Sequence, residues 1–153
     1  MYLVTKPHPG EYAPYASMYI DLLPDDGQVL KHLRDNLEAT KAFIHAFPEE
    51  KLSERIFAYR ALRFARQDAT ALSAFNQEAY VPVSRANTRD IETILEEYMA
   101  VRMATMTLCE SFEEEVYVRR GIASENRVSV RALVYMIAGH ELHHRTSIRE
   151  NYR

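Results

Sequence analysis

The chain has 153 residues, enough for one domain with a single hydrophobic core. Hydrophobic residues make up 47% and charged residues 27%, which is the balance of a soluble globular protein rather than of a disordered one. With only 4 Gly and 6 Pro, the composition favours helices over a turn-rich β fold. The formal net charge of −3 argues against a general nucleic-acid-binding protein, which normally carries a basic face.

Cysteine use and hydropathy indicate a cytoplasmic protein. The single Cys109 cannot form an intramolecular disulfide, so the fold does not need an oxidising compartment. Residues 1–7 contain no apolar signal core, and no apolar run approaches the ~20 residues that cross a bilayer. We therefore expect no contact with a membrane.

Residues 1–24 are predicted to form an extended arm. Prolines and a glycine interrupt any long helix there, at Pro7, Pro9, Gly10, Pro14 and Pro24. Tyrosines interleave with them, which indicates side chains half buried against a core with their hydroxyl groups in water. We expect the arm to pack over the domain, and a substrate-gating arm is the alternative.

Four amphipathic helices follow the arm, separated by a loop-like stretch at 68–87 and a turn-rich link at 121–127. Apolar residues recur at alternating spacings of three and four, which is the helical period. The expected helices run from the Asp25-Asp26 cap to Pro48, and over about 53–67, 88–112 and 129–152. We predict one all-α domain over residues 1–153, a four-helix bundle.

Two residues on the inward stripe of the third helix are unusual. Arg102 carries a charge into the interior, so it needs either a nearby glutamate or a polar cavity. Cys109 is interpreted as a small core residue rather than a nucleophile. On the second helix, four arginines are expected to form a solvated or ion-paired face, with binding of an anionic substrate as the alternative: Arg55, Arg60, Arg63 and Arg66.

The last helix contains candidate metal ligands in the string Ala-Gly-His-Glu-Leu-His-His, from Ala138 to His144. At ~100° per residue, His140 and His144 lie one turn apart within the apolar sector, and His143 points to its edge. Imidazoles at i and i+4 can bring two nitrogens to one ion at ~2.0–2.1 Å. We predict that His140 and His144 bind a divalent metal, in preference to a purely structural pair of buried histidines.

The same residues match His-Glu-x-x-His, the zincin peptidase signature, with Glu141 as general base. A zincin needs a third protein ligand downstream. Glu150 lies ~240° round the helix from His144 and cannot reach the same ion. A zincin-type peptidase is therefore the weaker interpretation.

The sequence resembles the DinB-like family, four-helix-bundle metalloenzymes that include bacillithiol transferases. The resemblance covers nearly the whole chain. It depends on five segments, namely 6–12, 54–66, 128–133, 138–144 and 148–150. It implies a DinB-like bundle that binds zinc, nickel or a similar ion through three histidines, two of them at the positions of His140 and His144.

The third family histidine is not present in this sequence. The resemblance places it on the second helix shortly before Glu54, where residues 49–53 read Glu-Glu-Lys-Leu-Ser. The helix that we predict there also looks short by roughly 20 residues compared with its neighbours. Either the protein has lost a segment, or residues are missing between Leu52 and Glu54; the family pattern on both sides favours the second explanation.

The resemblance implies a metal-dependent enzyme that acts on a small molecule. We expect either S-transfer of a low-molecular-weight thiol to an electrophile or hydrolysis. Glu141 is a weak catalytic candidate, and a partner that orients an imidazole is the expected role. The competing function is that of a metal-free helical bundle that serves as a binding or scaffold protein. Homodimer formation is open in both cases.

Overall fold

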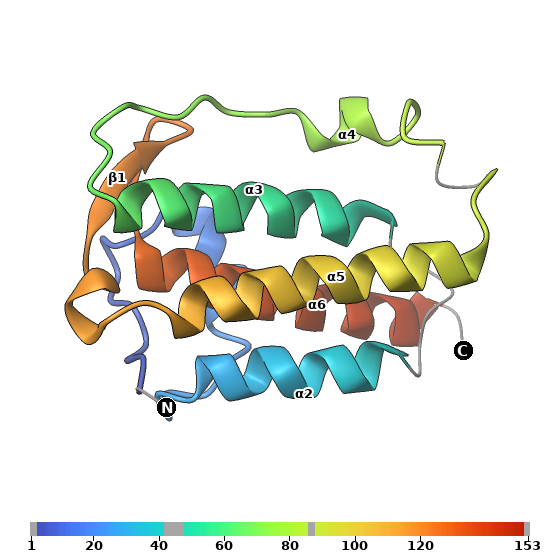
Figure 1. The fold of residues 1–153 in the computed structure, drawn as a ribbon, viewed down its shortest axis with the longest axis horizontal. Helices are drawn as coiled ribbons and strands as arrows, with labels where there is room; N and C mark the ends of the chain where they lie inside the picture. Colours follow the sequence, from blue (N-terminus) through green and yellow to red (C-terminus); the bar gives the residue numbers. More distant parts are fainter. Residues whose placement is uncertain (1–2, 42–47, 86–87, 152–153) are drawn as a thin grey trace.

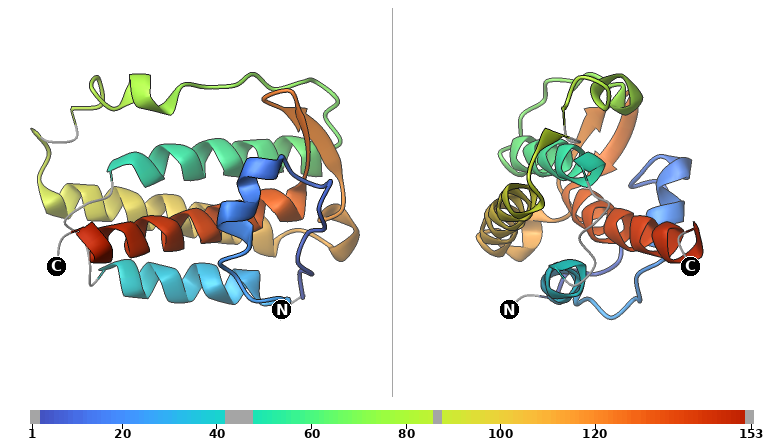
Figure 2. Two further views of the ribbon diagram at one scale, coloured as in Figure 1. Left: turned by 180° about the vertical axis from the view of Figure 1, so that it is seen from behind. Right: turned by 90° about the vertical axis from the view of Figure 1, so that its right-hand side faces the viewer.

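In the computed structural model, which describes residues 3–41, 48–85 and 88–151, four long helices form a bundle (Figure 1). They are α2 (Val29–Lys41), α3 (Pro48–Ala65), α5 (Ile91–Glu110) and α6 (Val130–Asn151). Seen end-on, the four helices occupy the corners of the bundle (Figure 2, right). The predicted all-α fold is confirmed, and within the described residues no helix is long and apolar enough to cross a membrane.

The core lies around α6. On α2 only one stripe is buried, including Leu30, Leu33 and Leu37, as expected of a helix at the surface of a bundle. On α6, by contrast, every residue from 130 to 141 is buried. A helix that is buried all round must be covered on every side, and α6 packs against α1, α2 and α3.

The second bundle helix is longer than predicted. It begins at Pro48, not near Ser53, and a proline is well suited to the first turn because no N–H is needed there. With 18 residues, α3 is close in length to α5, which has 20. The expectation of a helix short by about 20 residues is therefore wrong. Residues 42–47, the predicted end of the first helix, lie outside the described residues.

The link predicted as a turn at 121–127 is a β-hairpin. Strands β1 (Arg120–Ala123) and β2 (Asn126–Ser129) pair antiparallel, and Ser124 and Glu125 both have positive φ, at 51° and 64°. Such two-residue turns match the twist of the strands, but they usually contain Asn or Gly, so the sequence signal was weak. The hairpin leads directly into α6, where the Ser129 hydroxyl accepts a hydrogen bond from the N–H of Ala132 at 3.1 Å.

The stretch at 68–87 and the segment after α5 each contain one short helical element among their described residues. These are α4 (Gln77–Tyr80) and η3 (Glu114–Val116).

The arm is not extended throughout, which corrects the sequence prediction. It contains η1 (Pro14–Ala16) and α1 (Ser17–Ile20), and it crosses the outer side of α6 (Figure 2, left). The prediction that the arm packs over the bundle is confirmed by the contact between α1 and α6. Tyr12 and Tyr19 are half buried, whereas the Tyr15 side chain is 55% exposed.

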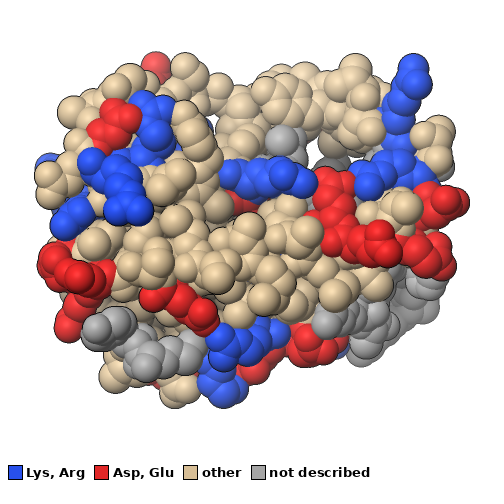
Figure 3. Space-filling model, viewed as in Figure 1, with Lys and Arg blue, Asp and Glu red and all other residues tan. Residues whose placement is uncertain are grey.

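Charges of both signs are mixed on the face seen in Figure 3. Acidic and basic side chains lie around a central uncharged area over α3 and α5, and several basic side chains gather at the upper left of this view.

Candidate metal site

His140 and His144 meet on one side of α6. Their Nε2 atoms are 3.2 Å apart and their ring centroids 4.4 Å apart. His140 is buried, with 7% of its surface exposed, and His144 is half buried. The predicted convergence of these two imidazoles is therefore present in the structure, with one ring in the interior and the other reaching the surface.

Aromatic rings from two other helices contact His140. The ring of Tyr19 on α1 lies 5.0 Å from it, and the ring of Phe57 on α3 lies 6.3 Å from it, both edge-on. Tyr19 also contacts the ring of His143, 5.6 Å away, and burial raises the pKa of the Tyr19 hydroxyl. His143 is half buried, which agrees with its predicted place at the edge of the apolar sector.

The separation of the two nitrogens fits a shared metal ion. Two ligands that bind at ~2.0–2.1 Å with an angle between a right angle and a tetrahedral one lie about 2.9–3.4 Å apart. The observed 3.2 Å falls within this range, and it also suits a hydrogen bond between one imidazole N–H and the other ring's lone pair. Among the described residues, no group of three or more His, Cys, Asp or Glu side chains could hold a metal. The described part of the site is thus a pair of donors.

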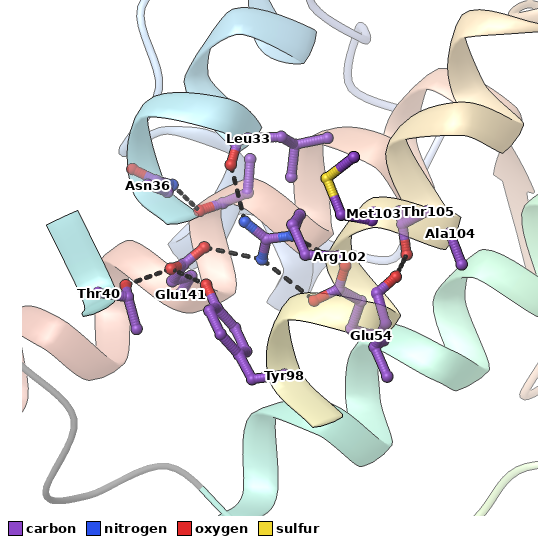
Figure 4. Close-up of polar contacts among 12 residues, drawn as sticks. Leu33, Asn36, Thr40, Glu54, Tyr98, Arg102, Met103, Ala104, Thr105 and Glu141 are labelled. Carbon is purple, nitrogen blue, oxygen red and sulfur yellow. Dashed lines mark hydrogen bonds and ion pairs between the residues drawn. The ribbon is translucent and has the colours of Figure 1, made fainter. Parts of the chain in front are cut away.

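Glu141 does not face the histidine pair. Its carboxylate lies in the bundle interior, 1% exposed, where it accepts hydrogen bonds from the hydroxyl groups of Thr40 and Tyr98 (Figure 4). Its Oε2 atom forms an ion pair with Nη2 of Arg102 at 2.8 Å. A general base must reach the proton it removes, but this carboxylate is engaged by Thr40, Tyr98 and Arg102. These contacts include no imidazole, so they also do not support the expected role of Glu141 in orienting a histidine.

Arg102 joins Glu141 to α3 and α2. Its guanidinium group donates to both carboxylate oxygens of Glu54, at 2.9 and 3.1 Å, and to the carbonyl oxygen of Leu33 at 2.8 Å. Burial lowers the pKa of Arg102, but the carboxylates of Glu54 and Glu141 outweigh burial and hold it well above its usual value. Of the two alternatives for Arg102, the structure shows pairing with glutamate.

The arginines of α3 and Cys109 are the remaining residues that the sequence singled out. Arg55 and Arg63 form ion pairs with Glu97 and Asp68, as expected of an ion-paired helix face. For Arg60 the expectation is wrong, because its side chain is buried and donates to the Ser73 carbonyl oxygen and the Ser124 hydroxyl group. Cys109 is buried, and burial raises its pKa to about 12, which agrees with a core residue rather than a nucleophile.

Tyr19 and Gly139 also shape this site, and the sequence pattern did not predict either of them. A Cβ atom on Gly139 would lie 2.0 Å from the carbonyl oxygen of Tyr19, so α1 approaches α6 where α6 has no side chain. The only sequence signal was a glycine inside a helix, directly before His140.

Comparison with known proteins agrees with this architecture. No curated protein and no solved structure matches the chain. The sequence model of the DinB superfamily matches residues 52–148, more than half of the chain, including α5, the hairpin and both histidines of the pair. The chain therefore belongs to the DinB superfamily.

Proposed function

We propose that the protein is a metal-dependent enzyme that acts on a small molecule through a divalent ion held by His140 and His144. The observation that carries this proposal is the 3.2 Å separation of their Nε2 atoms on one side of α6. DinB-like proteins often bind metal, which supports the same assignment. The reaction that we favour is transfer of a low-molecular-weight thiol to an electrophile, and hydrolysis is the second candidate.

A bound zinc or nickel ion would supply Lewis acidity, which lowers the pKa of a coordinated water or thiol toward neutrality. The residues of the chain itself prepare the two nitrogens for this role. Tyr19 and Phe57 cover the His140 ring and exclude water from it, while half-buried His144 leaves the pair open to a substrate. A pair of protein donors leaves further positions for water and substrate, at the cost of weaker metal affinity than a three-histidine site.

The position of Glu141 supports this proposal over a peptidase. In the His-Glu-x-x-His mechanism the glutamate acts beside the metal, but here Glu141 is bound to Arg102, Thr40 and Tyr98. A Glu141→Gln variant should therefore lose stability rather than a proteolytic activity, because wild-type protein should not cleave casein.

Metal binding is tested on protein purified without a histidine tag or chelator. Inductively coupled plasma mass spectrometry should find zinc or nickel close to one ion per chain after equilibration and desalting. A titration against a chromophoric zinc chelator then gives the affinity for zinc. His140→Ala and His144→Ala should each abolish binding, because a single remaining imidazole is a poor site.

Two other histidines on the chain serve as matched controls. His143→Ala removes the adjacent imidazole on α6. His32→Ala removes an imidazole on α2, which pairs with Asp26 at 2.9 Å. Both variants should keep wild-type zinc affinity. If His143→Ala lost zinc as completely as His140→Ala, the assigned pair would be wrong.

Activity distinguishes the two reactions and the scaffold alternative. Metal-loaded protein is offered small thiols with an electrophile such as monobromobimane, and separately activated esters and amides. We expect thiol conjugation above the uncatalysed rate, lost in His144→Ala and on chelation. Protein that takes up no metal, and whose unfolding temperature zinc leaves unchanged, would instead be a metal-free binding or scaffold protein.

A further inference from the structure

We propose that Tyr19 is a positioning residue for the histidine pair, and that Gly139 allows the arm to bring it there. The metal readout of this inference rests on the proposed function, whereas the orientation of the imidazoles can be measured without a metal. No residue of the arm belongs to the predicted ligand set, so the inference adds α1 to the site.

Ring contacts carry the argument. Tyr19 packs edge-on against both His140 and His143, with interplanar angles of 72° and 77°. Phe57 contacts the His140 ring from α3 at an interplanar angle of 89°. An imidazole in contact with two aromatic rings has little freedom to rotate, so the Nε2 atom of His140 is directed at His144. Preorganised ligands of this kind bind a metal more tightly than mobile ones.

Tyr19 also contacts a second imidazole on α6, that of His143. His143 lies next to His144 in the chain, and their ring centroids are 5.6 Å apart. The Tyr19 ring lies at the same centroid distance from His143, 5.6 Å, as the His144 ring does. One tyrosine of the arm thereby restricts the rotation of two neighbouring imidazoles on α6.

Gly139 explains why the tyrosine can be so close. A β-carbon there would lie 2.0 Å from the carbonyl oxygen of Tyr19 and 2.5 Å from its carbonyl carbon, both of them backbone atoms of α1. Glycine within a helix is destabilising relative to alanine, because it loses more conformational freedom on folding. On α6 the missing side chain leaves room for α1 to approach directly beside His140.

The test uses the full chain and four variants. Tyr19→Leu keeps an apolar side chain but removes the ring, and Tyr19→Phe restores the ring without the hydroxyl group. Gly139→Ala moves α1 away from α6, and Met18→Ala changes an exposed neighbour on the same short helix. Long-range proton–nitrogen NMR of the imidazoles reports their tautomers in metal-free protein, and the zinc titration reports affinity.

We expect wild-type protein, Tyr19→Phe and Met18→Ala to show fixed tautomers for His140 and His144. Tyr19→Leu and Gly139→Ala should show averaged imidazole signals and a zinc affinity lower by about 10–100-fold. Circular dichroism checks that each variant is folded; if Gly139→Ala is not, the two Tyr19 variants decide the matter.

A folded Tyr19→Leu variant with wild-type imidazole signals and wild-type zinc affinity would overturn the inference. So would a Tyr19→Phe variant that behaves like Tyr19→Leu, because the hydroxyl group rather than the ring would then be responsible. If wild-type protein binds no zinc, the proposed function fails, and the tautomers alone decide the role of Tyr19.

Discussion

Replacing Arg102 with methionine should destabilise the protein strongly. The guanidinium group is 1% exposed and is paired with two carboxylates that are 4% and 1% exposed, those of Glu54 and Glu141. Removing the arginine leaves two buried carboxylates without a counter-charge and the Leu33 carbonyl without a donor. Breaking a buried ion pair costs about 3–5 kcal/mol, a large part of the 5–15 kcal/mol that stabilises a typical domain.

The assay is urea unfolding at pH 7, followed by circular dichroism, with the free energy obtained by linear extrapolation. Arg34→Met is the matched control, because Arg34 forms an ion pair with Glu110 whose two side chains are 51% and 39% exposed. That pair should contribute less than about 1 kcal/mol. If Arg102→Met lowered the free energy of unfolding no more than Arg34→Met does, burial would not determine the energy of the pair.

Three further predictions concern other parts of the fold. Burial raises the pKa of Glu11, but hydrogen bonds from Arg131 and the His8 N–H outweigh it and lower the pKa to about 2. Glu11 should therefore contribute up to about 3 kcal/mol to the free energy of unfolding above pH ~4.5, and this contribution should disappear as the pH falls toward 2. Urea titrations of Glu11→Gln over the same pH range should not show this decrease. Cys109 should react with a thiol reagent at pH 8 on the order of 100-fold more slowly in native protein than in urea, and equal rates would contradict its burial. Gly121→Ala should lower the free energy of unfolding by at least about 1–3 kcal/mol, because the new Cβ would lie 2.1 Å from the buried Phe64 ring. Ile122→Ala, at a 40% exposed site, should lower it much less in the same urea titration.

Helical periodicity predicted the parts of this molecule that depend on a single helix. The place of His140 and His144 on one side of α6 follows from a spacing of four residues, and so does the burial of Arg102 on α5. Hydrophobic spacing also predicted the bundle, because each amphipathic helix must bury its stripe against others.

Contacts between segments far apart in the sequence could not be predicted in this way. The partner of Arg102 was left open, because Glu54 and Glu141 lie on two other helices. Tyr19 was not recognised because its contact with His140 depends on how the arm crosses α6. The hairpin was predicted only as a turn, because Ser124 and Glu125 adopt positive φ without the usual glycine or asparagine.

The environment of His140 follows from the residues on either side of it. Glu141 turns toward the interior, where its ion pair with Arg102 ties α6 to the bundle. Gly139 lies under α1 and allows the backbone of Tyr19 to approach. Rotating α6 about its axis would pull the carboxylate from Arg102 and would bring side chains against the backbone of α1. The rotation of α6 is thus fixed from two sides, and this places His140 on the side of the helix that it shares with His144. Loss of Arg102 should for this reason also disturb the histidine pair, although no atom of Arg102 belongs to it.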